Sequence, residues 1–357
     1  MTSDAENIAN KKAVRAAMNA IAESEPGALG ARLAGIYHAD AAWRGSHPWN
    51  EFKGLESIEK LFWAPLLHSF PDLERRDGIV MGGAYQGRAY VGMVGHLAGS
   101  FRRDWIGLPA TDQVVYLRYG EFHQMVAGKI AQSSVLIDVL DFIRQAGFWP
   151  LGPSRGHEAM WPGPISGDGI LLSPQDERES AASLKLTLDM QASLGRYDDT
   201  LGGGREGLLT MPQVKFWHPK MMWYGPAGIG TTRALAGFVD YHQLPFRTAF
   251  PNAPNTPRSV ERGKDGKSHY ARIGDGKYSA TGGWPSRHVN HLGGGWLGLG
   301  PTGRAITMRV MDFYLAGQGL IRENWVPIDI VNALLQMDVD VLARVRSQLG
   351  GRRHPER

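Results

Sequence analysis

The chain carries the same series of landmark residues twice, and this is the strongest constraint on its fold. The paired landmarks are Tyr37-His38 with Trp217-His218, Trp43 with Trp223, Phe70-Pro71 with Phe250-Pro251, His96-Leu97 with His291-Leu292, Pro109 with Pro301, and Asp138 with Asp329. The first three pairs are 180 positions apart, the histidine pair 195 and the aspartate pair 191, which indicates about fifteen extra residues after Phe250 in the second copy. Solenoid units recur about every 20 to 50 residues. A spacing this long predicts a duplicated domain, with the same fold and a cavity of its own in each half.

Composition narrows the class of protein. A length of 357 residues suits two domains, and the absence of cysteine excludes disulfides, thiolate nucleophiles and zinc–thiolate sites. The N-terminus shows no basic segment followed by an apolar core, and no apolar run is long enough for a membrane span, so we expect a cytoplasmic protein without a membrane partner. The net charge of +4 is spread over mixed signs apart from a basic tail at residues 349–357, so we expect no nucleic-acid partner.

The order of helical and strand patterns predicts an α+β fold in each copy. Apolar residues at helical spacing predict helices over about residues 11–23, 29–36 and 55–70, and alternating patterns predict strands over about 89–96, 113–124 and 130–138. The second copy repeats this order, with helices around residues 183–194 and 231–246. Helices that precede a sheet pack on one side of it, and a sheet that curves around them encloses a pocket.

We therefore predict two tandem cone-shaped domains, each with three helices packed on a curved antiparallel sheet. The first copy occupies residues 1–150 and the second residues 177–348. Residues 151–176 are rich in proline and glycine and are expected to form a linker or strap that lies on a surface.

Three motifs near the end of the second copy form a series that is also present, less completely, in the first. In the second copy they are Gly298-Leu299-Gly300-Pro301-Thr302-Gly303-Arg304, Met311-Asp312-Phe313-Tyr314, and Gly319-Leu320-Ile321-Arg322-Glu323-Asn324-Trp325 with Asp329. In the first they are Gly107-Leu108-Pro109-Ala110-Thr111, Gly120-Glu121-Phe122, and Gly128-Lys129-Ile130 with Asp138. This series resembles the C-terminal half of the SnoaL-like polyketide cyclases, which belong to the nuclear transport factor 2-like (NTF2-like) superfamily. The resemblance implies the same cone of helices against a curved sheet, but that superfamily contains cyclases, dehydratases, isomerases, epoxide hydrolases and binders, so it does not fix the reaction.

The resemblance implies a role for one aspartate in each copy. In the family, the aspartate that ends the last strand acts as acid and base beside a carbonyl, and Asp329 and Asp138 match that place. A carboxyl inside an apolar cone is desolvated, which raises its pKa toward neutrality. In an extended strand Trp325 and Asp329 share one face, so both can point into the cavity. The alternative is that each aspartate caps the helical segment that follows it, at residues 139–144 or 330–335.

The histidines depart from the family pattern. The cyclases place a histidine two residues before a glycine on the middle strand, and here those places hold leucine, with His96 and His291 one residue earlier. A shift of one residue moves a side chain to the other face of a strand unless a bulge restores it. Either these two histidines point into the pocket as catalytic partners of the aspartates, or the usual acid–base partner is missing.

Further aromatic and histidine side chains are expected to bind the substrate. The residues expected in this role are Trp223, Trp325, His218, His288, Trp43 and His38. His288 and His291 with Asp275 or Asp329 form a conceivable metal ligand set, but two histidines three residues apart on a strand lie on opposite faces. We therefore predict no metal site and no cofactor.

Three functions remain open from the sequence. The first is an enzyme, similar to a polyketide cyclase, isomerase or hydro-lyase, that uses acid–base chemistry on a small hydrophobic or aromatic carbonyl compound. The second is a non-catalytic small-molecule binding protein, and the third is a structural fusion in which one copy is degenerate. Members of the superfamily commonly dimerise through the outer face of the sheet, so the resemblance implies a homodimer or an intramolecular pseudo-dimer.

Overall fold

The computed structural model describes residues 3–194, 203–251 and 269–350, which form two domains of the same topology. The first domain contains α1 (Asp4–Ala22), α2 (Leu29–Ile36), β1 (Tyr37–Gly45), β2 (Glu51–Lys53), α3 (Leu55–Ile58), α4 (Ala64–Ser69), β3 (Glu74–Tyr85), β4 (Arg88–Ser100), β5 (Val114–Val126), β6 (Lys129–Ile137) and α5 (Val139–Gln145). The second contains α6 (Glu177–Leu194), α7 (Gly204–Thr210), β7 (Trp217–Tyr224), β8 (Thr232–Arg233), α8 (Ala234–Phe238), α9 (Leu244–Ala249), β9 (Ala271–Asp275), β10 (Tyr278–Asn290), β11 (Ala305–Gly317), β12 (Leu320–Trp325), α10 (Ile330–Gln336) and α11 (Val341–Gly350).

Each domain is built on one six-stranded sheet. The strand orders are β2-β1-β6-β5-β4-β3 and β8-β7-β12-β11-β10-β9. The pairs β1–β6 and β7–β12 are parallel and the other neighbours are antiparallel. The predicted α+β class and tandem duplication are confirmed, with the refinement that the sheets are mixed and not purely antiparallel.

The third helical segment of each domain has an unusual turn at the same place. A π-helical turn spans Glu59–Trp63 in the first domain and Val239–Gln243 in the second, directly before α4 and α9. Pro65 and Pro245 lie in the first turn of α4 and α9, where a missing backbone N–H is tolerated. Each proline therefore directly follows a wider helical turn, a feature that often marks functional sites.

The strand registers correct one of the sequence landmarks. The backbone N–H of Phe101 donates to the carbonyl of Gln113, and that of His291 donates to the carbonyl of Arg304. Gln113 and Arg304 are 191 positions apart, the same spacing as the paired aspartates, so His291 corresponds to Phe101. The predicted pairing of His96 with His291 is wrong. The spacing is 190 here (291 − 101) against 180 before, so ten extra residues, and not about fifteen, lie between Phe250 and His291 in the second copy. Part of this stretch, residues 252–268, lies outside the described residues.

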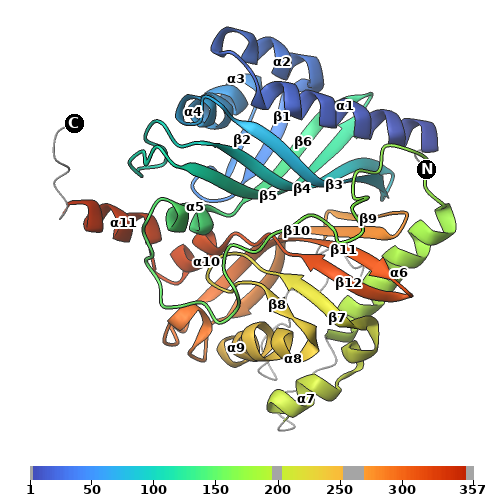
Figure 1. Cartoon of the computed structure of the whole chain (residues 1–357), viewed down its shortest axis with the longest axis vertical. Helices are drawn as coiled ribbons and strands as arrows, with labels where there is room; N and C mark the ends of the chain where they lie inside the picture. Colours follow the sequence, from blue (N-terminus) through green and yellow to red (C-terminus); the bar gives the residue numbers. More distant parts are fainter. Residues whose placement is uncertain (1–2, 195–202, 252–268, 351–357) are drawn as a thin grey trace.

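The two sheets pack face to face within the chain, with α1 to α4 on one outer side and α7 to α9 on the other, while α5 and α10 lie next to each other where the domains meet (Figure 1). Phe122 of β5 stacks on Phe313 of β11, with ring centroids 5.3 Å apart. A Cβ atom at Gly120 would overlap Pro327 of the other domain, so glycine permits this close approach. Apolar side chains from both sheets form one buried layer between the domains. The tandem chain thus buries the outer faces of both sheets against each other.

The connecting segment at residues 146–176 runs over both domains. Its backbone pairs with β3 at Val80, where Ile170 forms an isolated parallel bridge, and it pairs with the second domain through His157 and Thr231. Trp161 is buried, and the indole N–H of Trp325 donates to the carbonyl of Pro162 (2.8 Å). No helix in the described part of the chain has the length and apolar character needed to cross a membrane.

Candidate active site

A cavity of about 370 Å³ lies inside the second cone. This volume is within the range of small-molecule sites, roughly 300–1,000 Å³. Its aromatic lining comes from β7, the third helical segment and β11: Trp217, Trp223, Phe238, Phe246, Phe250 and Tyr314. Polar side chains, among them Gln191, Asp312 and Asn324, share the lining with these rings and decide what chemistry the cavity supports.

One wall of the cavity is a stacked pair of rings. His242, on the π-helical turn, stacks on Trp223 with centroids 4.1 Å apart and an interplanar angle of 18°. A Cβ atom at Gly225 would overlap the indole of Trp223, so the glycine leaves room for the ring to fold back over its own strand. Burial, with help from Arg287 and Arg247, lowers the pKa of His242 to about 3, so the imidazole is neutral at physiological pH. The pair offers a flat surface to a ligand.

Asp312 is the carboxyl group of the cavity. It lies on β11, where successive side chains alternate between faces. Asp312 and Tyr314 line the cavity, whereas Met311 and Phe313 belong to the layer between the sheets. Desolvation in this apolar enclosure raises the pKa of Asp312 to about 6, although hydrogen bonds from Tyr314 and Asn324 and the charge of Arg287 oppose the rise.

A small hydrogen-bond network holds Asp312 in place. The side-chain amide of Gln191, on α6, donates to the hydroxyl of Tyr314 (3.2 Å) and to that of Thr281 (2.9 Å). Burial beside the Asp312 carboxyl raises the pKa of Tyr314 well above its usual value, so the phenol stays protonated. Asn324 donates one amide hydrogen to the carbonyl of Phe313 (3.1 Å) and bonds to Asp312 as well. The acid is thus oriented by side chains from three different elements.

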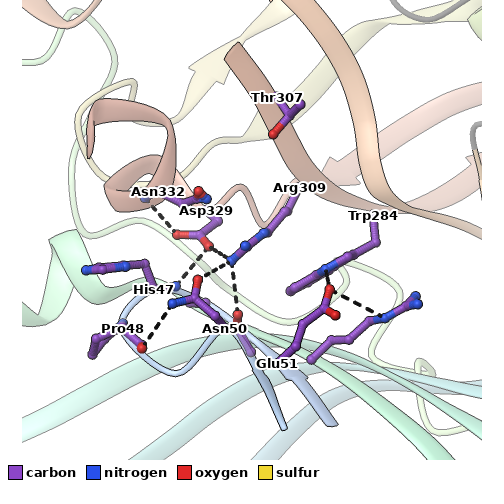
Figure 2. Close-up of polar contacts among 12 residues, drawn as sticks. His47, Pro48, Asn50, Glu51, Trp284, Thr307, Arg309, Asp329 and Asn332 are labelled. Carbon is purple, nitrogen blue, oxygen red and sulfur yellow. Dashed lines mark hydrogen bonds and ion pairs between the residues drawn. The ribbon is translucent and has the colours of Figure 1, made fainter. Parts of the chain in front are cut away.

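Asp329 lies away from this cavity, at the contact between the domains (Figure 2). It is the N-cap of α10, and one carboxylate oxygen accepts the backbone N–H of Asn332 (3.1 Å). The other oxygen accepts the backbone N–H of His47, in the first domain, at 2.9 Å and Arg309 at 3.0 Å. Burial raises the pKa of Asp329, as expected, while Arg309 and the two N–H donors oppose that rise. The contact with the backbone N–H of Asn332 is that of the capping alternative.

Asp138, in the first domain, makes the equivalent contacts with the second domain. It is the N-cap of α5, with one oxygen accepting the N–H of Asp141 (3.1 Å). Its other oxygen accepts Arg118 at 3.2 Å and the backbone N–H of Ala227, in the second domain, at 2.8 Å. Burial raises the pKa of Asp138 to about 6 against the charge of Arg118. The two aspartates are equivalent, as predicted, and together they join the domains through a pseudo-symmetric pair of caps.

The predicted facing of the last strand is inverted. Trp325 and Asp329 do lie on the same side, but that side packs between the sheets: Trp325 lies against Tyr224, with ring centroids 5.1 Å apart. Asn324 and Val326 line the cavity instead. Because side chains alternate along a strand, choosing the wrong face exchanges every cavity residue for an interface residue.

The predicted histidines of the second copy are not among the described residues that line the cavity. His291 is buried against Phe250 (centroids 5.1 Å apart), and its Nδ1 bonds to the hydroxyl of Thr302 at 3.1 Å. His288 is exposed on β10. His218 accepts the backbone N–H of Lys220 at 2.9 Å within its own strand. Of the residues predicted to bind substrate, the structure places only Trp223 on the cavity.

The histidines and the tryptophan predicted as site residues in the first copy contact other protein groups. Trp43 is buried in an aromatic cluster with Phe62, at 4.6 Å between ring centroids. His38 bonds to the carbonyl of Val126 (2.9 Å). His96 lies edge-on to Tyr116, and burial lowers its pKa to about 4.

The interior of the first cone contains an ion pair where the second has its cavity. Glu121 occupies the position of Asp312 and forms a two-pronged salt bridge with Arg75, with N–O distances of 3.2 and 2.8 Å. Burial alone would raise the pKa of Glu121, but Arg75 and His123 lower it to about 2. The His123 ring also bonds to Ser133 (2.8 Å). All four side chains are buried, and this carboxylate is internally paired and ionised at physiological pH because Arg75 and His123 lower its pKa.

Asp312, Tyr314, Asn324 and His242 were not predicted as site residues. A signal was present for the first two, since an aspartate and a tyrosine two positions apart in an apolar strand share a face. His242 was signalled only by comparison of the copies, because the first copy has Phe62 there. Among the described residues, no group of three or more histidines and carboxylates is placed to hold a metal ion.

No protein-family model and no curated protein matches the chain. Solved structures do match, and each match spans about two fifths of it. A protein described as a SnoaL-like polyketide cyclase from Jannaschia Sp. CCS1 is 18% identical, with 38% of this chain and 90% of that chain covered and a TM-score of 0.34. IdmH from Streptomyces antibioticus, described as a polyketide cyclase, is 15% identical, with 39% of this chain and 99% of that chain covered and a TM-score of 0.32. An NTF2-like protein from Burkholderia thailandensis E264 is 18% identical, with 39% of this chain and 97% of that chain covered and a TM-score of 0.30. The chain is similar to SnoaL-like and NTF2-like proteins. Its fold is assigned from the two six-stranded sheets described above.

Proposed function

We propose that the second domain is a cofactor-free acid–base enzyme that acts on a small hydrophobic carbonyl compound, as a cyclase, isomerase or hydro-lyase does. The observation that carries this proposal is Asp312, a carboxyl group in an aromatic cavity with a pKa raised to about 6. A general base or acid works best when its pKa lies near the working pH. The proposal transfers the role expected of Asp329 to Asp312.

The chemistry follows from the groups around Asp312. Above about pH 6 its carboxylate removes a proton from the carbon next to a carbonyl, and the electron pair moves to the carbonyl oxygen to form an enolate. The protonated Asp312 then returns the proton to another carbon or to a leaving hydroxyl group. Tyr314 and Asn324 keep the carboxyl aimed through both states, since each bonds to it. The Arg287 guanidinium, whose charge acts on Asp312, stabilises the negative charge that develops on the enolate oxygen.

The first domain serves as a structural partner in this proposal. Its interior contains packed aromatic side chains and the Arg75–Glu121 ion pair. Its sheet covers the outer face of the catalytic sheet, and its loop supplies the N–H group that binds Asp329. The fusion hypothesis therefore describes the first copy, and the enzyme hypothesis describes the second.

Proton–deuterium exchange tests the proposal directly. Aromatic ketones such as 1-tetralone are incubated with the protein in deuterated buffer at pH 7.5, and loss of the α-proton signal is followed by NMR. Asp312→Asn is expected to lower the enzymatic rate by about 10²- to 10⁴-fold, the usual contribution of a general base. Glu121→Gln, the matched change in the first domain, is expected to leave the rate within about twofold, provided that a melting curve shows it folded. An unchanged rate in Asp312→Asn rejects the proposal, and ligand binding without exchange in the wild type favours the binding-protein hypothesis.

A further inference from the structure

Strand β10 has a bulge beside the cavity that its counterpart in the first domain lacks. The pairing of β10 with β11 shifts between Gly283 and Arg287, whereas β4 pairs with β5 over residues 89–100 without a shift. Ser286 and Arg287, at the end of this bulge, line the cavity. A Cβ atom at Gly283 would overlap Ser286, so the glycine permits the tight fold of the bulge. Bulges are common next to active sites, where they change the direction of a side chain.

Trp284, within the bulge, contacts the first domain. Its indole N–H donates to a carboxylate oxygen of Glu51, the first residue of β2, at 2.7 Å. The guanidinium of Arg309 lies over the ring of Trp284, 4.6 Å from its centroid. Figure 2 shows Glu51 reaching Trp284 across the contact between the domains. The bulge therefore has Ser286 on the cavity and Trp284 against the first domain.

Arg309 connects the neighbouring strand, β11, to the same part of the first domain. Its guanidinium donates to the side-chain oxygen of Asn50 (2.9 Å) and to the carbonyl of Gly45 (3.4 Å). The next residue along the strand, Val310, lines the cavity, and so does Asp312. Two adjacent strands of the cavity wall are thus held from behind by one short segment of the first domain.

The equivalent arginine of the first domain has different partners. Arg118, 191 positions before Arg309, is paired with Asp138 (3.2 Å) and Asp141 (3.3 Å) of its own domain. Packed aromatic side chains lie inside the first cone, and close packing holds the elements of a core in place. In the second cone, β10 and β11 border a cavity of about 370 Å³. Contacts on the outer face of these two strands therefore carry a larger share of their support.

We infer that residues 45–51 of the first domain, the β1–β2 corner, are a positioning element for the site in the second cone. Through Trp284 and Arg309 the corner holds the β10 bulge and β11 together, and it thereby fixes the place of Asp312 relative to the bulge. The corner is not part of the described cavity lining, so it acts through the strands and not on the ligand. This inference deepens the proposed function, on which its effect on turnover rests: the first domain sets the rate of the second in addition to its stability.

A double variant that removes both side-chain acceptors tests the inference in the full chain. Asn50 has a φ of 53°, which glycine adopts freely, so Asn50→Gly removes the side chain without backbone strain. Glu51 is exposed, so Glu51→Ala leaves the core intact. In Asn50→Gly/Glu51→Ala, amide hydrogen exchange measured by mass spectrometry should become about tenfold faster over residues 283–290 and 305–312, the size expected for two lost hydrogen bonds. Exchange over residues 114–126, in β5, should stay unchanged.

The ketone exchange assay separates positioning from general stability. With 1-tetralone, the maximal rate of the double variant should fall about 10- to 100-fold, the usual result of a small displacement of a catalytic group, while its KM stays within about threefold. Its midpoint in urea should stay close to that of the wild type. Asn50→Asp/Glu51→Gln keeps an acceptor oxygen at both positions and the same net charge, so it should keep most of the rate. Lys53→Ala, on β2, removes only a contact with the exposed Asp40 and should change neither the rate nor amide exchange.

Two results overturn the inference. Unchanged amide exchange in β10 and β11 of the double variant would show that the β1–β2 corner does not hold these strands. Faster amide exchange with an unchanged maximal rate would show that the site does not depend on the corner. A wild type that exchanges no ketone protons rejects the proposed function instead, and faster amide exchange in the double variant then still supports the corner as the element that holds the cavity wall.

Discussion

The two domains use one fold for opposite purposes. In the first, Trp43, Phe62 and Trp63 fill the space under the helices, and Glu121 is neutralised by Arg75. In the second, a cavity of about 370 Å³ remains, and the equivalent carboxyl group, Asp312, is held at a pKa of about 6. A cone whose acid is ion-paired gains internal packing, whereas a cone whose acid is desolvated keeps a group that can exchange protons.

The electrostatic difference follows from the partners of the two acids. The carboxylate of Glu121 receives two guanidinium hydrogen bonds, which stabilise its charged form. Asp312 receives hydrogen bonds from the neutral groups Tyr314 and Asn324, and these offset only part of its desolvation. The duplication thus shows that burial alone does not set the pKa of an acid in this fold, because the identity of the neighbouring donor decides the direction of the shift.

The largest expected effect is on the ion pair of the first domain. Arg75→Met leaves Glu121 buried without its guanidinium partner, and breaking a buried pair in this way costs about 3–5 kcal/mol of the free energy of unfolding. Urea denaturation followed by circular dichroism measures it. Asp312→Asn is the matched change in the second domain and should cost nothing at pH 7, since it replaces a desolvated carboxylate by a neutral group. Similar losses in the two variants would mean that the two acids are equally paired.

The next effect concerns the contacts that join the domains. Asp138→Ala and Asp329→Ala each remove a helix cap, worth about 1 kcal/mol, and leave an N–H group of the other domain without its acceptor, which costs about 1–3 kcal/mol. Each variant should therefore lose about 2–4 kcal/mol in urea denaturation, and the two losses should be similar. A loss in only one of the two variants would show that the two aspartates do not contribute equally to the interface between the domains. Retained exchange activity in folded Asp329→Ala would further separate this residue from the chemistry.

The sequence predicted the fold well because the signal for it is repeated. The duplication, the helix order and the α+β class depend on patterns spread over many residues, so single errors have little effect. The assignment of Asp138 and Asp329 as equivalent positions also follows from spacing alone. Two roles were offered for them, acid–base catalysis from the family resemblance and helix capping from the local sequence, and capping describes the contacts that the carboxylates make.

The site was harder to predict, because it depends on which face of a strand points inward. Trp325 and Asp312 lie in neighbouring strands, yet one packs between the sheets and the other lines the cavity. Both faces of each sheet are buried in a tandem chain, so the usual contrast between an apolar and a polar face is lost. The pairing of His96 with His291 failed for a related reason, since matching letters do not reveal the strand register that places Phe101 opposite Gln113.

The pH dependence of stability sharpens the comparison of the two acids. The folded pKa of Asp312, about 6, lies above its ordinary value of 3.8, so its contribution to stability is fully present below about pH 4 and is lost as the pH rises through 6. A shift of about two units corresponds to nearly 3 kcal/mol, and access of water to the cavity reduces this to roughly 2 kcal/mol. The difference in unfolding free energy between the wild type and Asp312→Asn should therefore change by roughly 2 kcal/mol from pH 4 to pH 7, in favour of the variant. A difference that is constant with pH would show that Asp312 titrates normally.

The smallest expected effect comes from exchanging one ring between the domains. His242→Phe copies Phe62 into the second cone, keeps the stack on Trp223, and removes a ring nitrogen, Nδ1, that is buried without a hydrogen-bond partner among the described residues. Removing such an unsatisfied atom should stabilise the protein by about 1 kcal/mol in urea denaturation. The reciprocal change, Phe62→His, places a polar ring against Trp43 in a filled core and should cost roughly 1–3 kcal/mol. Opposite signs in the two variants are expected because the two cones differ in what their interiors require. If His242→Phe instead destabilises the protein, then Nδ1 of His242 has a bonding partner in the folded state, and the wall of the cavity is polar and not merely a stacking surface.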